Sequence, residues 1–443
     1  MPESEKIYEA DIIDTTVMGA GVARIDGAAT FVRGGVEGDR CAFRITEKKK
    51  NYFLAEAEKI IKYSDNRIDN DCPYYSRCGG CSLRHISYEH EGEIKAAAVR
   101  TALEKAGVRD FKMNPIKMPS PDGYRNKAVF HFDDHGGVGF HAESTREVIP
   151  LRSSPCRVVP EEFCRIARFC AELFRDDAPD SVTARKSTSG KLAVAFDLGG
   201  KGRKMPDQST AEQIMSAFPA VTGVFARSDG RQEYALIKGE RHIINEICSM
   251  RYLVSPDAFF QVNYEGAEMM FSEIASFAGD GEIRNIFDLF CGTGTIGIFL
   301  ASRHPEASIT GIEINSQAVE NAKMNAALNL TENASFRCGD ASEYAALCGD
   351  RSPDLTVIDP PRAGCSDRTL SALLTVLPKR IIYVSCNPFT LARDVKRLES
   401  GGYKLIEATP INMFPRSEHV ETVVLLQHGD DWGVNYENYG ISH

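Results

Sequence analysis

The chain has 443 residues, of which 43% are hydrophobic and 26% charged, and its formal net charge is −10. This composition excludes extended disorder and low-complexity repeats, and the length predicts two or three domains. The acidic balance argues against non-specific coating of nucleic acid and against anionic membranes. Since no apolar run reaches roughly 18 residues and the acidic start is unlike a signal peptide, we expect a cytoplasmic protein without membrane contact or an obligatory protein partner.

Residues 1–62 are predicted to form a small β-barrel. Short apolar-alternating runs are separated by glycine-containing turns, for example at Gly19, Gly27 and Gly38. Five short strands in this length favour a barrel of the OB type. Such a barrel either binds nucleic acid or is purely structural, and the local pattern leaves both open. Lys48–Lys50 are candidates for an RNA-binding face or for an ordinary solvated surface.

The second predicted module, residues 63–250, mixes helices and strands. A helix is expected over 88–107, where an apolar stripe is followed by Gly107, and we expect it to pack on the catalytic domain. Further strands are predicted at 124–132, 138–142 and 191–198, and a further helix at 161–174. Arg125 and Lys127 are two more candidates for a basic face.

A cluster of cysteines distinguishes this module. Cys72, Cys78 and Cys81 lie within ten residues, and the chain has thirteen cysteines. An odd number in a chain without an export signal argues against a disulfide framework. Cys156 is the best-placed fourth ligand for a site of four thiolates, which suits Zn²⁺ or an iron–sulfur cluster. The three-plus-one spacing favours [4Fe–4S] over zinc, and free thiols are the remaining alternative.

Strands and helices alternate through the third module, residues 251–443. This alternation predicts a doubly wound, Rossmann-like parallel sheet, in which the last two strands form an antiparallel edge. The whole chain is therefore expected to be a multidomain α/β protein. The predicted strands of this module are 285–290, 308–314, 334–340, 355–361, 380–386, 403–411 and 420–426.

A glycine-rich loop follows the first of these strands. Gly292, Gly294 and Gly297 match the dinucleotide pattern G-x-G-x-x-G, but Asp288 precedes them. That acid would repel a pyrophosphate, whereas it suits the ammonium group of S-adenosylmethionine, which we therefore favour over a dinucleotide. Glu313 and Asp340 end the next two strands, where they could bind the ribose hydroxyls and the adenine amino group. Ligands bind at this edge of a parallel sheet.

Two further motifs are expected at the same edge. Asp359-Pro-Pro-Arg362 follows the fourth strand and Ser385-Cys386-Asn387-Pro388 the fifth. A cysteine beside a methyl donor suggests covalent catalysis, in which a thiolate adds to C6 of a pyrimidine and activates C5. Cys365 is a weaker rival nucleophile. Cys291 and Cys338 are interpreted as ordinary buried thiols.

The proposed chemistry also needs a base that removes the C5 proton. Glu421 is the candidate, because it begins an apolar strand that would hold it rigidly. His419, two residues earlier, is the rival.

These motifs, in this order, resemble the RNA uracil-C5 methyltransferase family, and the similarity is closest to the branch that modifies 23S ribosomal RNA. They are Asp-Leu-Phe-Cys-Gly-Thr-Gly at 288–294, Asp-Pro-Pro-Arg at 359–362, Ser-Cys-Asn-Pro at 385–388 and Phe-Pro-x-x-x-His-Val-Glu at 414–421. The resemblance implies methyl transfer from S-adenosylmethionine to C5 of a uridine, with Cys386 and Glu421 as the catalytic pair. It also implies an RNA-binding TRAM barrel at the N-terminus and a [4Fe–4S] cluster on the four cysteines.

The resemblance assigns further residues. Segment 255–263 is similar to the family motif Ser-Pro-x-x-Phe-x-Gln-x-Asn, which places Gln261 on the methyl donor and Phe259 on the target uracil. By spacing alone, Phe259 and Phe260 would both belong to the core. Asp359 would bind the uracil edge or the donor. The remaining expected contacts to the methyl donor are Phe290, Thr295, Glu313 and Asp340.

Three other functions are kept as alternatives. A tRNA uridine methyltransferase would use the same chemistry on a different RNA. A non-catalytic RNA-binding iron–sulfur protein would not need Cys386 and Glu421. An NAD-dependent oxidoreductase would use the glycine pattern but would leave the Ser-Cys-Asn-Pro motif and the cysteine cluster without a role.

Overall fold

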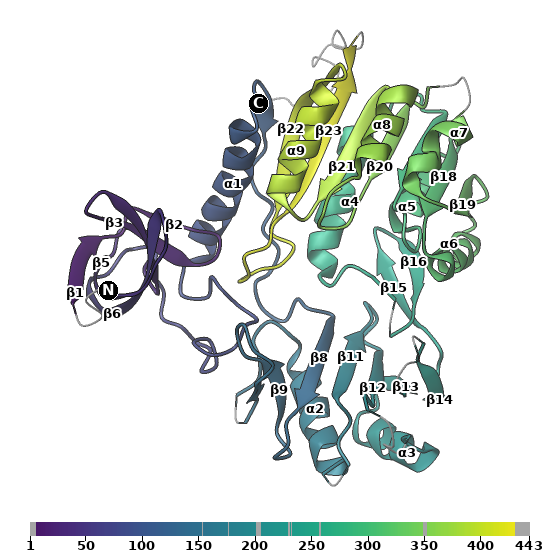
Figure 1. Ribbon diagram of the computed structural model, residues 1–443. Helices are drawn as coiled ribbons and strands as arrows, with labels where there is room; N and C mark the ends of the chain where they lie inside the picture. The colour runs from purple at the N-terminus through teal and green to yellow at the C-terminus, as the bar shows by residue number, and fades with distance from the viewer. Residues whose placement is uncertain are drawn as a thin grey trace. The chain divides into compact units, whose positions relative to one another are not determined.

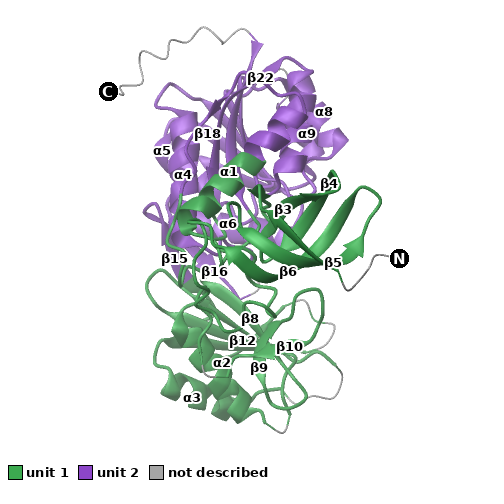
Figure 2. Ribbon diagram, turned by 90° about the vertical axis from the view of Figure 1, so that its left-hand side faces the viewer, with its two compact units in different colours: residues 1–98, 118–243, 412–419 green, residues 99–117, 244–411, 420–443 purple. Residues whose placement is uncertain are grey.

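The structure is a computed structural model, and it divides into two compact units. It describes residues 6–152, 154–175, 177–200, 205–228, 231, 233–256, 258–348 and 352–429. Asp257 of the expected uracil-binding motif, the start of the first predicted module (1–5) and the end of the third (430–443) therefore lie outside the described residues. Unit 1 comprises residues 1–98, 118–243 and 412–419, and unit 2 comprises residues 99–117, 244–411 and 420–443 (Figure 2). The three-module division at 62 and 250 stays a prediction.

The first part of unit 1 is a six-stranded sheet with the order β1-β5-β6-β4-β3-β2. Its alternating residues point inward to a small core that includes Val32, Cys41 and Phe43. All neighbouring strands are antiparallel except β4 and β6, which run parallel. The strands are β1 Ile7–Asp11, β2 Asp14–Thr15, β3 Ala20–Ile25, β4 Ala28–Arg33, β5 Arg40–Lys48 and β6 Tyr52–Lys62.

The second part of unit 1 is a seven-stranded sheet with the order β10-β9-β8-β11-β12-β13-β14. Helix α2 (Glu161–Leu173) packs its apolar stripe, with Phe163, Ile166 and Cys170, into the core of this sheet. The other elements are β8 Lys127–Phe132, β9 Val138–His141, β10 Val148–Pro150, β11 Ser181–Lys186, β12 Leu192–Asp197, α3 Gln208–Ala217, β13 Val221–Arg227 and β14 Ala235–Gly239.

Unit 2 contains an eight-stranded sheet with the order β19-β18-β17-β20-β21-β23-β22-β7. Strands β19 to β21 run parallel, as predicted, and helices cover both faces, with α4 and α5 on one face and α8 and α9 on the other (Figures 1 and 2). The strands are β7 Lys112–Met113, β17 Asn285–Leu289, β18 Ser308–Glu313, β19 Ala334–Cys338, β20 Leu355–Ile358, β21 Arg380–Ser385, β22 Tyr403–Ile411 and β23 Glu421–His428. The helices are α4 Tyr264–Ala278, α5 Thr295–Arg303, α6 Ser316–Leu328, η1 Ala341–Glu343, α7 Tyr344–Cys348, α8 Asp367–Val376 and α9 Pro388–Glu399.

The antiparallel strands at the end of the chain differ from the expected simple edge. β23 inserts between β21 and β22, and the short β7 pairs beyond β22, so the last two strands are not the edge of the sheet. The sequence of β7 is only two residues long, which is too short for an apolar period to reveal it. A separate pair, β15 (Ile243–Ile247) and β16 (Met250–Val254), precedes α4.

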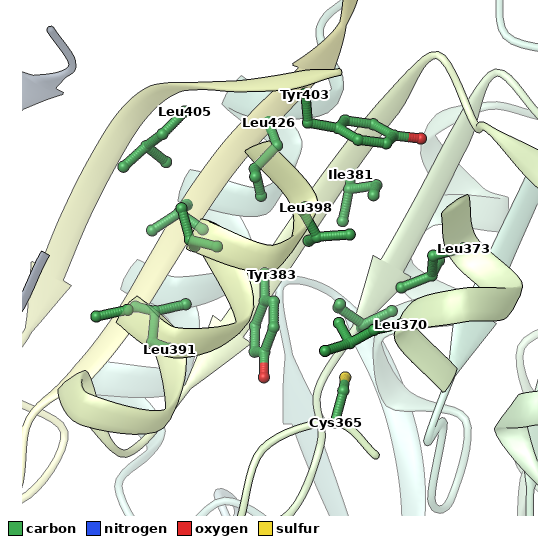
Figure 3. Close-up of a cluster of buried hydrophobic side chains, with 14 of the residues drawn as sticks. Cys365, Leu370, Leu373, Ile381, Tyr383, Leu391, Leu398, Tyr403, Leu405 and Leu426 are labelled. Carbon is green, nitrogen blue, oxygen red and sulfur yellow. The ribbon is translucent and has the colours of Figure 1, made fainter. Parts of the chain in front are cut away.

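The core of unit 2 is built from apolar residues of the sheet and of the helices on it. Figure 3 shows part of this cluster, in which Leu370 and Leu373 of α8 and Leu391 and Leu398 of α9 surround Tyr383 of β21. Helix α1 (Tyr88–Lys105) begins in unit 1, and its last residues contribute Val99, Ala102 and Leu103 to the same cluster.

Candidate active site

The loop between β17 and α5 is held by a buried acid. Asp288 is fully buried, and its Oδ2 accepts a hydrogen bond of 2.8 Å from the backbone N–H of Gly297. Among the described residues, its Oδ1 has no hydrogen-bond partner. Burial raises the pKa of Asp288 to about 8, helped by the charges on Asp359 and Glu313. A buried acceptor without a donor is the feature expected of a site that receives a polar ligand group.

The backbone of this loop turns through the left-handed region. Phe290, Gly292 and Gly294 have φ values of +62°, +53° and +79°. A Cβ on Gly294 would lie 2.8 Å from the ring of Phe336 and 2.9 Å from Cβ of Ala322, so glycine is required there for both conformation and space. Thr295 follows at the start of α5 and is partly buried.

The two other predicted acids lie at the ends of β18 and β19. Glu313 accepts backbone hydrogen bonds from Gly292 (3.1 Å) and Asn315 (2.8 Å), one on each carboxylate oxygen. Each oxygen keeps a second acceptor position, as ribose hydroxyls would need. Asp340 is exposed and caps η1 by accepting from Ser342 N, and hydrogen bonds from the side chain and then the backbone of Ser342 lower its pKa.

A buried asparagine supports the same loop and was not predicted. Asn325 of α6 is fully buried; its side chain accepts from Leu253 N (2.8 Å) and donates to Thr293 O (3.1 Å). It thus ties the glycine loop to β16, while Tyr252 donates from its hydroxyl to Thr295 O at 3.1 Å. The available signal was a polar residue within the apolar stripe of a predicted helix.

Cys386 and Glu421 are brought together by strand register. β21 and β23 pair antiparallel with Ser385 opposite Thr422, so the next residues along the pair are Cys386 and Glu421. Asp359 follows β20, the parallel neighbour of β21, and its N–H donates to Leu289 O at the end of β17. The predicted nucleophile, base and substrate-binding acid therefore lie at the same edge of the sheet, where its parallel strands have their carboxyl ends.

Burial and charge shift the pKa values of all three groups upward. The pKa of the Cys386 thiol rises to about 11, because burial and the charge of Glu421 oppose ionisation, while Arg362 lowers it. Burial and the neighbouring Asp359 raise the pKa of Glu421 well above its usual range. Burial raises the pKa of Asp359 to about 7. A carboxyl group with a raised pKa is suited to accept a proton near neutral pH.

The segment after Cys386 is fixed by its own side chains. Asn387 caps α9 by accepting from Phe389 N at 3.0 Å and donates to Arg362 O at 3.2 Å, and Pro388 occupies the first turn of the helix. This arrangement joins the Asp-Pro-Pro-Arg loop to the Ser-Cys-Asn-Pro loop. It leaves Phe389 with 72% of its surface exposed.

The rival residues have different surroundings. Cys365 is 5% exposed and belongs to the apolar core of unit 2 (Figure 3), and its N–H donates to Asp394. Cys291 is buried as expected, but Cys338 is exposed, which corrects its interpretation as a buried thiol. His419 belongs to unit 1, where its ring lies 5.8 Å from that of Phe414.

The aromatic side chains at 259 and 260 differ in exposure, which the spacing does not suggest. Phe259 is 75% exposed, whereas Phe260 is 4% exposed and its ring lies 5.8 Å from that of Tyr252. The spacing-based expectation that both are core residues is therefore wrong for Phe259. Gln261 is partly buried and lies two residues before Asn263, which caps α4.

The four cysteines of the predicted cluster interact with one another in unit 1. Burial, together with the charges of Cys156, Cys78 and Cys72, raises the pKa of Cys81 to about 12. All thirteen cysteines, each within the described residues, are free thiols. In the same part of the chain, no group of three or more His, Cys, Asp or Glu side chains is arranged to hold a metal ion. Four thiols supply the donor chemistry that an iron–sulfur cluster uses.

The predicted basic residues have mixed surroundings. Lys48–Lys50 are exposed at the end of β5, where Lys49 pairs with Glu47 and Lys48 lies 5.6 Å from the Phe53 ring centroid. Arg125 and Lys127 are partly buried. These side chains are compatible with the solvated-surface alternative as well as with an RNA-binding face.

Comparison with known proteins gives a consistent result. A family model described as tRNA (uracil-5-)-methyltransferase matches residues 237–429. A Bacillus cereus protein described as an uncharacterized RNA methyltransferase is 32% identical over 455 residues, which cover 96% of this chain and 98% of the relative. A Caldanaerobacter subterraneus protein with the same description is 34% identical, covering 95% and 98%.

A solved structure shares the fold across nearly the whole chain. The Pyrococcus abyssi tRNA (uracil-54, C5)-methyltransferase in complex with S-adenosyl-L-homocysteine superposes with a TM-score of 0.75 and 24% identity, covering 95% of this chain and all of the other. Among the described residues, no helix is long and apolar enough to cross a membrane.

Proposed function

This chain belongs to the RNA uracil-C5 methyltransferase family, and we propose that it transfers a methyl group from S-adenosylmethionine to C5 of a uridine through covalent addition of Cys386. The observation that carries this proposal is the pairing of β21 with β23, which sets Cys386 beside Glu421 at the ligand edge of the sheet. A thiol and a carboxyl group in adjacent register supply the nucleophile and the base that the reaction needs. Cys365 lies in the apolar core of unit 2, and the carboxylate beside it, Asp394, already accepts a hydrogen bond from its backbone N–H.

The methyl donor is proposed to bind at the loops after β17, β18 and β19. Asp288 would receive the methionine ammonium group on its unpartnered Oδ1, and Glu313 the ribose hydroxyls. Asp340 would bind the adenine amino group. Phe290, Thr295 and Gln261 complete the proposed set by family resemblance. S-adenosylmethionine supplies an electrophilic methyl group on sulfonium when it is bound.

The chain's residues would then act in sequence. The Cys386 thiolate forms a bond to C6 of the uracil, and the electron pair of the C5–C6 double bond moves to C5, which takes the methyl group while S-adenosylhomocysteine leaves. Glu421 removes the proton from C5, the double bond forms again, and the S–C6 bond breaks. Asp359 holds the uracil edge and Phe259 stacks on the base, which must leave its helix or loop stack to reach Cys386.

The RNA substrate is proposed to be 23S ribosomal RNA, with tRNA as the alternative. The motif resemblance favours the ribosomal branch. The β1–β6 sheet would act as a TRAM-type RNA-binding barrel. Proteins recognise folded RNA by its shape and by its unpaired loops. Selectivity for one RNA therefore does not require a high positive net charge on this acidic chain.

The experiment that tests the function is methyl transfer from labelled S-adenosylmethionine to total RNA from a strain that lacks this protein. Size separation and nucleoside analysis follow. We expect label as 5-methyluridine in large ribosomal RNA. Label in tRNA would retain the mechanism and replace the substrate. No label, from protein that binds the methyl donor, would contradict the proposal and favour a non-catalytic RNA-binding role.

We also propose that Cys72, Cys78, Cys81 and Cys156 hold a [4Fe–4S] cluster. The charges of Cys72 and Cys78 contribute to raising the pKa values of both Cys81 and Cys156, which supports a common site. Methyl transfer needs no redox step, so the expected contribution of the cluster is to hold the long loop between β6 and α1 in one conformation.

A further inference from the structure

The residues that precede the proposed base form a loop with an unusual set of anchors. β22 ends at Ile411 and β23 begins at Glu421, and these two residues pair with each other. The connecting segment, residues 412–420, therefore leaves and re-enters the sheet of unit 2 at one place. Residues 412–419 belong to unit 1, so the chain reaches Glu421 directly from a segment held by that unit.

A buried ion pair on α1 holds the start of this loop. Lys95 and Glu91 are both fully buried, one helical turn apart, with 2.9 Å between Nζ and Oε1. The Lys95 ammonium group uses its other two donors on the loop, at Asn412 Oδ1 (2.6 Å) and Phe414 O (3.1 Å). All three N–H groups of Lys95 are thus satisfied, two of them by the loop.

Glu91 holds the loop from the other side of the pair. Its Oε1 also accepts from Asn412 Nδ2 at 2.9 Å and from the backbone N–H of Arg416 at 2.8 Å. The carboxylate oxygen of Glu91 therefore binds the loop at Asn412 and Arg416, and the ammonium group of Lys95 binds it at Asn412 and Phe414. Asn412 is itself fully buried.

Arg416 is the third anchor. Its backbone is in the left-handed region with φ of +69°, a strained conformation for a side chain of this size. Its carbonyl accepts from Ser82 N (2.9 Å) and Leu83 N (3.0 Å), and its Nη1 donates to Ile86 O at 2.9 Å. Such a conformation persists only where its surroundings determine it fully.

A buried ion pair is weak evidence of a stabilising role, because replacing it with apolar residues of similar volume often leaves the free energy of unfolding unchanged or increases it. Here the pair makes more hydrogen bonds to the loop than within itself. We infer that Glu91 and Lys95 are positioning residues, which fix the 412–419 loop and thereby set Glu421 in line for removal of the C5 proton. This inference rests on the proposed function.

The test separates the two chemical steps. Covalent addition to RNA that contains 5-fluorouridine needs Cys386 but not the base, whereas turnover on ordinary uridine RNA needs both. For Lys95→Met we expect adduct formation on fluorinated RNA within about twofold of the unmodified protein. Turnover should fall about 100-fold, as for a misplacement of about 1 Å, and covalent adduct should accumulate on ordinary RNA.

Two further variants keep the test decisive. Asn412→Ala removes the loop partner and leaves the Lys95–Glu91 pair intact, so it should give the same pattern even if Lys95→Met does not fold. Asp197→Asn weakens another ion pair of unit 1, with Arg227 in the seven-stranded sheet, and should leave both steps unchanged.

Three results would overturn the inference. Adduct formation and turnover could fall in parallel, which would indicate a purely structural role. Turnover could be unchanged in a folded Lys95→Met or Asn412→Ala protein. Finally, the unmodified protein could form no adduct and transfer no methyl group, which would overturn the proposed function itself.

Discussion

At the scale of single residues, the reactivity of Cys386 depends on the charges around it. The pKa of its thiol is about 11, so only a small fraction is thiolate at neutral pH. Arg362 favours the thiolate and Glu421 opposes it. Without substrate, this environment therefore keeps most of the Cys386 thiol protonated at neutral pH.

This balance predicts opposite effects of two substitutions. Arg362→Gln should shift alkylation of Cys386 by iodoacetamide to higher pH, because a stabilising positive charge is removed. Glu421→Gln should shift it to lower pH, because the opposing negative charge of the carboxylate is removed. A shift of one unit in the pKa changes the thiolate fraction at neutral pH about tenfold.

The measurement is peptide mass spectrometry of the alkylated protein across a pH series. The exposed Cys338 provides an internal reference in the same samples. Equal profiles for Cys386 in all three proteins would show that these charges do not act on the thiol.

At the scale of elements, the glycine loop depends on α6 through Asn325. Asn325→Ala leaves the buried Leu253 N–H and Thr293 carbonyl without their partner, which should cost about 1–3 kcal/mol. The loosened loop should bind S-adenosylmethionine about tenfold more weakly, as measured by calorimetry.

A neighbouring asparagine gives the matched control. Asn329, one turn further along, bonds to Arg251 N and O of the same strand β16 but not to the glycine loop. Asn329→Ala should therefore leave methyl-donor affinity near that of the unmodified protein. Equal losses in both variants would assign the effect to β16 and not to the loop.

The cysteine segment is an element that the proposed cluster should order. Protein purified without oxygen is expected to contain about four irons and four sulfides per chain with a charge-transfer absorption band. Cys81→Ser should lose most of both, whereas Cys164→Ser, a neighbour that only accepts from Cys156 N, should keep them. Stoichiometric zinc without sulfide would contradict the cluster and favour the zinc alternative.

At the scale of the whole molecule, the parallel sheet was predictable because its central strands, β17, β20 and β21, are buried apolar runs between helical segments. Glu421 was predictable as a base because it starts such a strand. The strand pairing that places Cys386 beside Glu421 was not predictable, since the register of β21 and β23 depends on pairing between distant segments. The insertion of 412–419 into unit 1 is likewise a tertiary arrangement, which rests on contacts with residues more than 300 positions earlier in the chain.

The whole-molecule account has one central claim, that Cys386 attacks the uridine and Glu421 completes the reaction. It is tested most directly by incubating the protein and methyl donor with RNA containing 5-fluorouridine and mapping the covalent adduct by mass spectrometry. We predict an adduct on the Cys386 peptide that is lost in Cys386→Ala and retained in Cys365→Ala, and Glu421→Gln should trap adduct on ordinary uridine RNA. An adduct that disappears only in Cys365→Ala would contradict the account.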